Sequence, residues 1–250
     1  CVGYSNHVHG SDSYPETLIW NLYRFWHHIF NEVVRTADAY GTYRTDKISY
    51  IDIMGDFYPS DANQAEWWRR IWPNFYAWYT SAPPLPIQPW DIPYNKKTFE
   101  LVGQGENPPV NVANQINWAK NEIVQHGWVE PAQYAFEGYA PASWANGYYS
   151  WYIAYYDLFH SAAVAAGGWD RIIIEEIGAN HAPGSPYDDG AEGGILFSAS
   201  FAVLANFAPN VPIGVWTYYD NESVVGSRWG LYKTGDVLTQ GWWVLPYMWK

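Results

Sequence analysis

Short apolar runs alternate with longer amphipathic segments along most of this 250-residue chain. The runs are rich in β-branched and aromatic residues, as strands are, and the segments between them carry apolar residues at helical spacing. This alternation predicts an α/β fold in which helical crossovers connect the strands of a parallel sheet. The predicted strands are Val2–Asn6, Ile48–Met54, Thr98–Gly103, Gln133–Glu137, Arg171–Glu176 and Val211–Tyr218. The predicted helices are Pro15–Ala39, Asn63–Tyr79, Val112–Gln125, Tyr148–Ala166, Gly194–Phe207 and Leu238–Trp249.

The number of repeating units bears on the architecture. The pattern supplies about six βα units, whereas a closed barrel of this kind needs eight. An open doubly wound sheet would show the same alternation, but the chain lacks a glycine-rich phosphate loop of either common kind, so nucleotide binding has little support. The length fits one large α/β domain or a barrel better than two small domains. We expect residues 1–250 to form a single domain.

Aromatic residues are the outlier of the composition, with 17 Trp, 22 Tyr and 10 Phe. Aromatic rings stack on apolar faces of ligands while the polar tips of Tyr and Trp form hydrogen bonds. Because sugars present both kinds of surface, carbohydrate is the natural ligand class, although most of these rings are expected to fill the core. Adjacent rings are harder to bury together, which singles out Trp67–Trp68, Tyr148–Tyr149 and Trp242–Trp243.

The charge of the chain narrows the list of partners. The formal net charge is −12, from 13 basic and 25 acidic residues, which argues against nucleic acid and anionic membrane surfaces. No segment approaches the ~18 uninterrupted apolar residues of a membrane-spanning helix. The single cysteine, Cys1, excludes an internal disulfide.

Acidic residues stand at or just after the ends of several predicted strands. In parallel α/β architectures, active sites gather at the carboxyl ends of the strands. Cleavage of a glycosidic bond typically needs two carboxyl groups, one to protonate the leaving oxygen and one to attack the anomeric carbon or activate water. Residues from different strands can supply that pair, and the candidates are Asp56, Glu106, Glu137 and Glu176.

The segment Arg171–Gly178 is the most informative of these strand ends, because an isoleucine run leads directly into two glutamates. Neighbouring side chains on a strand point to opposite faces, so only one of Glu175 and Glu176 is expected to face a cleft. We expect that residue to be Glu176. The structural alternative is a buried carboxylate paired with Arg171 or with a backbone amide.

From this segment to the end, the chain resembles the clan A glycoside hydrolases, retaining (β/α)8 enzymes such as those of families 5 and 39. Ile174–Gly178 is similar to the end of strand seven in that clan, which places Glu176 at the catalytic nucleophile. Val215–Asp220 is similar to strand eight, where Trp216 would form a sugar platform. Trp229–Leu231 matches the segment before the final helix. The resemblance implies a (β/α)8, TIM-barrel-like fold.

Further upstream the resemblance is looser. Phe136–Pro141 is similar to strand six of the clan, with Tyr139 in the place of the tyrosine that would hydrogen-bond the nucleophile and Glu137 in the place of a histidine. Strand four of the clan ends in Asn-Glu-Pro, but Ile51–Pro59 has no glutamate, and the nearest acid is Asp56. Because aspartate is one methylene shorter, either Asp56 serves through altered geometry, or Glu137 has taken the acid/base role, or the protein does not hydrolyse glycosides.

This correspondence covers strands three to eight, so the first two βα units of the barrel would be missing. A start at Cys1 fits a processed or truncated chain, or one that an N-terminal fragment or a second chain completes. His9 lies after the first predicted strand, where the clan often has a histidine lining the sugar site. His7 and His9 lack a third ligand at a recognisable spacing, so neither a metal nor a cofactor is expected.

Two functions are compatible with these observations. The first is a retaining hydrolase that cleaves β-glycosidic bonds of an extracellular polysaccharide, with Glu176 as nucleophile and Asp56 or Glu137 as acid/base. The second is a carbohydrate-binding barrel without catalysis, which the missing Asn-Glu would explain. Either protein would work outside the cell or at its surface.

Overall fold

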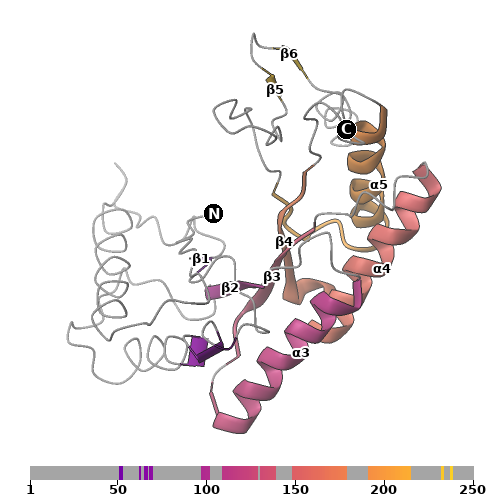
Figure 1. Cartoon of the computed structure of the whole chain (residues 1–250). Coiled ribbons are helices and arrows are strands. Elements are labelled where there is room, and N and C mark those ends of the chain that lie inside the picture. Colours follow the sequence, from indigo (N-terminus) through magenta and orange to yellow (C-terminus); the bar gives the residue numbers. More distant parts are fainter. Residues whose placement is uncertain are drawn as a thin grey trace, which may run out of the picture. The chain divides into compact units, whose positions relative to one another are not determined.

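A computed structural model describes parts of the predicted strands and most of the central helices (Figure 1). It divides the chain into two compact units, residues 1–101 with 118–134 and residues 102–117 with 135–250. The residues that the structure describes are 51–52, 62, 65–66, 68–69, 97–101, 109–128, 130–138, 148–178, 191–214, 232–233 and 237–238.

The first unit contains a short parallel strand pair. Strand β1, Ile51–Asp52, pairs with β2, Lys97–Leu101, so that Ile51 lies opposite Lys97. Both strands fall within or within one residue of the ranges that the sequence predicts. Parallel pairing of strands that are distant along the chain confirms the predicted kind of sheet.

A tryptophan cluster forms the described core of the first unit. Trp68 is completely buried, and its ring centroid lies 5.3 Å from that of Trp118 and 5.7 Å from that of Trp128. Trp118 belongs to helix α3, Pro109–His126, whose buried Ala119 and Ile123 follow at helical spacing. The ring of Trp68 is therefore a core residue of the kind that most aromatics were expected to be.

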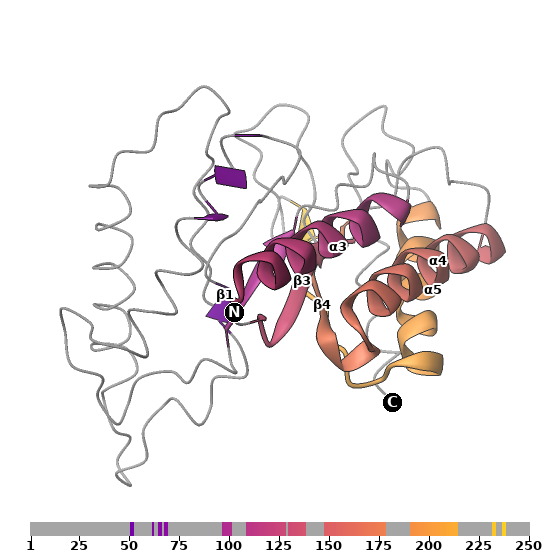
Figure 2. The same cartoon turned by 90° about the horizontal axis from the view of Figure 1, so that it is seen from below.

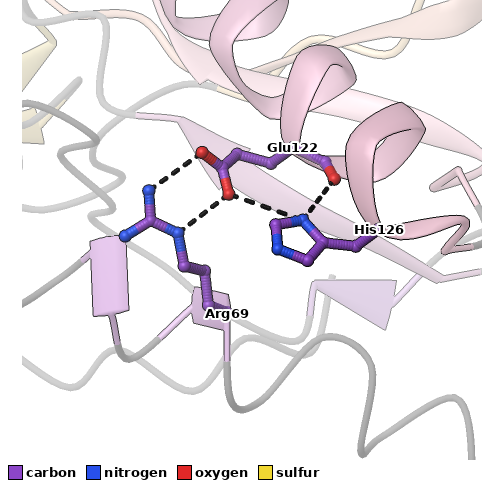
Figure 3. Close-up of polar contacts among 3 residues, drawn as sticks. All are labelled: Arg69, Glu122 and His126. Atoms are coloured by element: carbon purple, nitrogen blue, oxygen red, sulfur yellow. Dashed lines mark hydrogen bonds and ion pairs between the residues drawn. The ribbon is translucent and has the colours of Figure 1, made fainter.

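An ion pair next to this cluster ties the segment around Arg69 to helix α3 (Figure 3). The guanidinium of Arg69 donates two hydrogen bonds to the carboxylate of Glu122, at 2.8 and 2.9 Å. These bonds hold the pKa of Glu122 below its ordinary value and raise the pKa of Arg69. His126 lies one turn further along the helix, with Nδ1 2.9 Å from the Glu122 carbonyl oxygen and its ring stacked on Trp128 at 4.3 Å.

The second unit carries most of the described βα repeats, and only the first two residues of β3 belong to the first unit. Strand β3, Gln133–Glu137, and β4, Ile172–Glu176, are neighbours in the sheet, and α4, Tyr148–Ala166, connects them through the short helix η5, Trp169–Arg171. Helix α5, Ala191–Phe207, follows β4 and packs against α4, as Figures 1 and 2 both show. The bounds of β3 and α4 are those that the sequence predicts.

One face of β3 and β4 is covered by the apolar side of α4. Phe136 of β3 meets Phe159 of α4, with ring centroids 6.3 Å apart. The ring of Tyr155 packs on Phe159 at 5.3 Å, and Trp151 stacks on Tyr155 at 6.0 Å. All four side chains are completely buried. Burial of several aromatic side chains in one layer contributes strongly to stability, so this layer holds the two strands in place.

Two glycines end α4 where the sequence places its end. Gly167 and Gly168 have φ angles of 101° and 153°, a region that residues with a Cβ rarely adopt. Both of their N–H groups donate to the carbonyl oxygen of Ala163, at 2.9 and 2.8 Å. This glycine pair closes the last turn of the helix and turns the chain directly into η5 and β4.

The carboxyl-terminal part differs from the prediction. Strands β5, Tyr232–Lys233, and β6, Val237–Leu238, form an antiparallel pair, so the prediction that a helix starts at Leu238 is wrong. Of the strand predicted at Val211–Tyr218, the described residues show a single parallel bridge between Ile174 and Ile213. Among the described residues, no helix is both long and apolar enough to cross a membrane.

Candidate functional site

Two of the six predicted site residues lie in the part of the chain that the structure describes. Glu137 is the last residue of β3, and Glu176 is the last residue of β4. Both therefore stand at strand ends, as predicted. The other four lie outside the described residues, as does the further candidate Glu106, and their roles stay predictions: His9, Asp56, Tyr139 and Trp216.

The ends of β3 and β4 are in direct contact. The N–H of Gly138, the residue after Glu137, donates a 2.6 Å hydrogen bond to the carbonyl oxygen of Glu176. The backbones of the two glutamates therefore run side by side on neighbouring strands. Glu137 is only 5% exposed, whereas Glu176 is half-buried.

The face on which Glu137 lies follows from its neighbours. Phe136 packs against Phe159, so Phe136 faces helix α4. A Cβ on Gly138 would lie 3.0 Å from Cγ2 of Ile174 and 3.4 Å from Cε1 of Phe159, so Gly138 and Ile174 also face that helix. Because side chains alternate along a strand, Glu137, between Phe136 and Gly138, faces away from α4.

Strand β4 contains an irregularity at its two glutamates. Both backbone groups of Ile174 bond to the neighbouring segment. Its N–H donates to the Pro212 oxygen at 3.0 Å, and its carbonyl oxygen accepts from the Gly214 N–H at 2.8 Å. In a regular parallel ladder, the next residue to bond would be two positions further on, at Glu176. Instead, the N–H of Ile177 donates to the Gly214 oxygen at 3.0 Å. The strand has one extra residue here, which defines a β-bulge at Glu175–Glu176.

The bulge changes which side chains share a face. Ile174 faces α4. In a parallel ladder, the hydrogen bond from the Gly138 N–H to the Glu176 oxygen places Ile177 opposite Gly138, and therefore also on the α4 face. The two residues between these isoleucines therefore both lie toward the face that Glu137 occupies. The expectation that only one of Glu175 and Glu176 faces a cleft was based on strict alternation, and strict alternation does not hold through a bulge.

Gly214 makes room for this bulge. A Cβ at Gly214 would lie 2.1 Å from the carbonyl oxygen of Glu175, a distance that no side chain tolerates. A glycine is therefore required where the neighbouring segment passes the bulged peptide. Sequence reasoning missed both Gly214 and Glu175. The three-residue spacing of Ile174 and Ile177 could have indicated the bulge, because a regular strand repeats its buried face every second residue.

The three glutamates thus offer carboxyl groups on one sheet face, next to the carboxyl ends of two neighbouring strands. Carboxylates accept hydrogen bonds from hydroxyl groups, transfer protons and attack electrophilic carbon. Within the described ranges, no three His, Cys, Asp or Glu side chains gather closely enough to hold a metal ion. Carboxyl groups placed in this way can act on a hydroxylated or electrophilic ligand.

The aromatic pairs singled out in the sequence divide between core and surface. Trp68 is completely buried in the first unit, whereas Tyr149 on α4 is 76% exposed. Trp67 and the pair Trp242–Trp243 lie outside the described residues. Adjacency alone therefore does not mark a ligand platform, because a helix can place one ring of such a pair in the core.

Neither a family model nor a curated protein matches this chain. Among solved structures, it is similar to a thermostable mutant of a xylanase (Xyn10A) from Cellvibrio japonicus, with 11% identity, a TM-score of 0.52, and coverage of 96% of this chain and 73% of the xylanase. It also matches a family 17 β-1,3-glucanosyltransferase from Rhizomucor miehei, with 12% identity, a TM-score of 0.39, and coverage of 96% and 95%. An active-site mutant of that β-1,3-glucanosyltransferase, in complex with laminaritriose, gives 11% identity and a TM-score of 0.34, with 96% of both chains covered.

At these identities the comparisons concern the fold. The match to the xylanase extends over nearly the whole chain, and the described part contains parallel βα units. The α/β fold is thus similar to that of TIM-barrel glycoside hydrolases, as the sequence analysis predicted.

Proposed function

We propose that this protein is a glycoside hydrolase that cleaves β-glycosidic bonds of a polysaccharide with retention of configuration. The observation that carries the proposal is the placement of Glu137 and Glu176. They end neighbouring strands of the sheet, and both lie toward the face opposite helix α4. The similarity in fold to glycoside hydrolases supports it.

The spacing of the strands favours retention over inversion. Neighbouring strands lie about 4.8 Å apart, and retaining enzymes hold their two carboxyl groups about 5–5.5 Å apart. Inverting enzymes leave about 6.5–9.5 Å between them to accommodate a water molecule. Side chains that leave adjacent strands on one face match the shorter distance, so this geometry favours Glu137 over Asp56 as the partner of Glu176.

The two glutamates then take complementary roles. Glu137 donates its proton to the leaving oxygen while a carboxylate oxygen of Glu176 attacks the anomeric carbon, which yields a covalent glycosyl-enzyme. In the second step, Glu137 removes a proton from water, the water oxygen attacks the same carbon, and Glu176 is released as a carboxylate. Because a polysaccharide does not enter cells intact, we place this activity outside the cell or at its surface.

The nucleophile assignment is tested with Glu176→Gln on xylan, laminarin and carboxymethyl cellulose. We expect the wild-type protein to release reducing ends from one of them, and the variant to lose at least about a thousandfold of that activity while it still binds the same polysaccharide. Asp157→Asn, which changes an exposed carboxylate on α4, is the matched control and stays active. Full activity in Glu176→Gln would contradict the role of this residue.

The acid/base assignment needs a different readout. Glu137→Ala should hydrolyse 2,4-dinitrophenyl glycosides slowly. The dinitrophenolate leaves without an acid, so the glycosyl-enzyme still forms, but its hydrolysis by water is slow because the base is missing. Added azide, which attacks without a base, should then restore turnover and form a glycosyl azide of retained configuration. Absence of azide rescue, together with rescue in Asp56→Ala, would transfer the acid/base role to Asp56.

A carbohydrate-binding barrel without catalysis is the second candidate. One observation favours it, namely that Ile51–Pro59 carries no Asn-Glu where strand four of the clan A enzymes has its acid/base. Polysaccharide binding by wild-type protein that releases no reducing ends from any of the three substrates would establish this candidate and exclude the first.

A further inference from the structure

We infer that Glu175 is a substrate-binding residue of the same site and accepts hydrogen bonds from hydroxyl groups of the sugar that reacts with Glu176. The inference rests on the proposed function. The sequence prediction, based on strict alternation, left Glu175 out of the cleft. The bulge at Glu175–Glu176 brings it to the face of Glu137 and Glu176.

The position of Glu175 is close to the reacting atoms. Consecutive Cα atoms are about 3.8 Å apart, and both side chains of the bulge lie toward one face. The carboxyl groups of Glu175 and Glu176 therefore reach neighbouring atoms of one ligand. If Glu176 attacks the anomeric carbon of a sugar, the hydroxyl groups on adjacent carbons of the same ring lie within reach of Glu175.

The chemistry of Glu175 suits this task. An ionised carboxylate is purely an acceptor of hydrogen bonds, and its bonds to hydroxyl groups are shorter and stronger than those between neutral groups. Glu175 is half-buried, so a hydrogen bond from a ligand to its carboxylate would form where water competes less than at an exposed side chain. Hydrogen bonds to sugar hydroxyls near the reacting carbon strengthen in the transition state of glycoside hydrolysis.

The irregular backbone of the bulge supports a functional role for the position of Glu175. It interrupts the regular ladder of β4, requires glycine at position 214 and brings Glu175 toward the face that already carries two carboxyl groups. A regular strand would keep one of the two glutamates on the α4 face, against Phe159 and the apolar layer. The bulge instead places both glutamates toward the face of Glu137.

The test compares wild-type protein and Glu175→Gln on 4-nitrophenyl β-xylobioside and β-laminaribioside, and on monodeoxy versions of whichever glycoside is cleaved. We expect Glu175→Gln to lower kcat/KM for the intact glycoside by about ten- to a hundredfold, mostly in kcat. On the deoxy substrate that lacks the contacted hydroxyl, wild type and variant should differ by less than about twofold. Glu175→Asp, which keeps the charge, should recover part of the loss.

The possible outcomes separate this inference from the proposed function. An equal loss on every deoxy substrate, or no loss on the intact glycoside, would overturn the role of Glu175 while leaving the hydrolase in place. If the wild-type protein cleaves none of these glycosides and none of the three polysaccharides, the proposed function fails and the inference fails with it. Thermal unfolding of each variant shows whether it folds. If Glu175→Gln does not fold, the comparison of wild-type protein and Glu175→Asp on the intact and deoxy substrates tests the role of Glu175 instead.

Discussion

At the scale of single residues, Glu122 illustrates how a charge becomes part of the structure. Its two hydrogen bonds from Arg69 join a carboxylate that is 12% exposed to a guanidinium that is 36% exposed. The planar guanidinium matches both carboxylate oxygens, a geometry that lysine could not reproduce. The lowered pKa of Glu122 means that the folded state favours the ionised carboxylate.

This pair predicts a dependence of stability on pH. Because the pKa of Glu122 is lower in the folded than in the unfolded chain, the pair stabilises the fold above the ordinary carboxyl pKa, and the stabilisation disappears as pH falls through the lowered value. We expect Glu122→Gln to reduce the free energy of unfolding at pH 7 by about 1 kcal/mol, a figure discounted for the exposure of Arg69. Urea unfolding at pH 7 and at pH 3 measures this difference.

The measurement at pH 3 tests the direction of the pKa change. At pH 3 the gap between wild type and Glu122→Gln should shrink, since Glu122 is then increasingly protonated in both states. Glu66→Gln removes an exposed carboxylate that lies near the same arginine and should change stability by only a few tenths of a kcal/mol. A gap that grows toward low pH would contradict the direction of the pKa change.

At the scale of elements, strand β4 combines a regular half with an irregular one. Ile172, Ile173 and Ile174 are completely buried, as the apolar run predicts. The bulge that follows shifts the register by one residue, so Ile177 rather than Glu176 bonds to Gly214. Bulges redirect side chains beside active sites in many proteins, and here one redirects two carboxylates.

The bulge predicts that Gly214 cannot be replaced by alanine without loss of activity. Its Cβ would lie 2.1 Å from the Glu175 oxygen, so the backbone of β4 must move. We expect Gly214→Ala to destabilise the protein by about 1–3 kcal/mol and to reduce glycoside cleavage more than tenfold, measured by urea unfolding and by release of reducing ends. The control is Gly127→Ala, where φ is 65° but no atom lies within 4 Å of the added Cβ.

The two alanine variants distinguish the loss of stability that any alanine at a positive φ causes from the loss of activity that displacement of the bulge causes. Gly127→Ala should lose about 1 kcal/mol because of its positive φ and keep full activity, since it follows the end of α3 and an added Cβ there meets no atom within 4 Å. If Gly214→Ala were as active as Gly127→Ala, the bulge would not position the carboxyl groups that act on the substrate.

At the scale of the whole molecule, the net charge of −12 bears on the choice of polysaccharide. A protein with this charge repels polyanions at low ionic strength, and the candidate site adds three glutamates. The proposed substrate is therefore a neutral polysaccharide, in keeping with carboxyl groups that contact hydroxyls.

This argument predicts a preference that can be measured directly. We expect turnover of neutral xylan or laminarin to exceed that of polygalacturonate by at least tenfold at low salt, and added salt to narrow the ratio because it screens the repulsion. The assay measures reducing ends at low and at high sodium chloride. Faster cleavage of polygalacturonate at low salt would show that local cations, not the net charge, govern the choice.

The sequence by itself determined the order and type of the described elements, except for η5, which contains Arg171 where a strand was predicted to begin, and for β5 and β6. Hydrophobic periodicity placed β3 and α4 at their observed bounds, and the pair Gly167–Gly168 follows directly after the predicted end of α4. It also placed Glu137 and Glu176 at strand ends. These features are local, because the spacing of apolar residues and the backbone freedom of glycine act within a few residues along the chain.

The tertiary structure decided which strands are neighbours and in what register. That β3 lies beside β4, and that Ile177 bonds to Gly214, depends on hydrogen bonds between segments far apart along the chain. A shift of one residue in such a ladder exchanges the faces of all later side chains, which is why alternation alone excluded Glu175. Likewise, only the fold places Trp68 against Trp118 and Trp128. The sequence alone does not distinguish a tryptophan that packs in the core from one that binds a ligand.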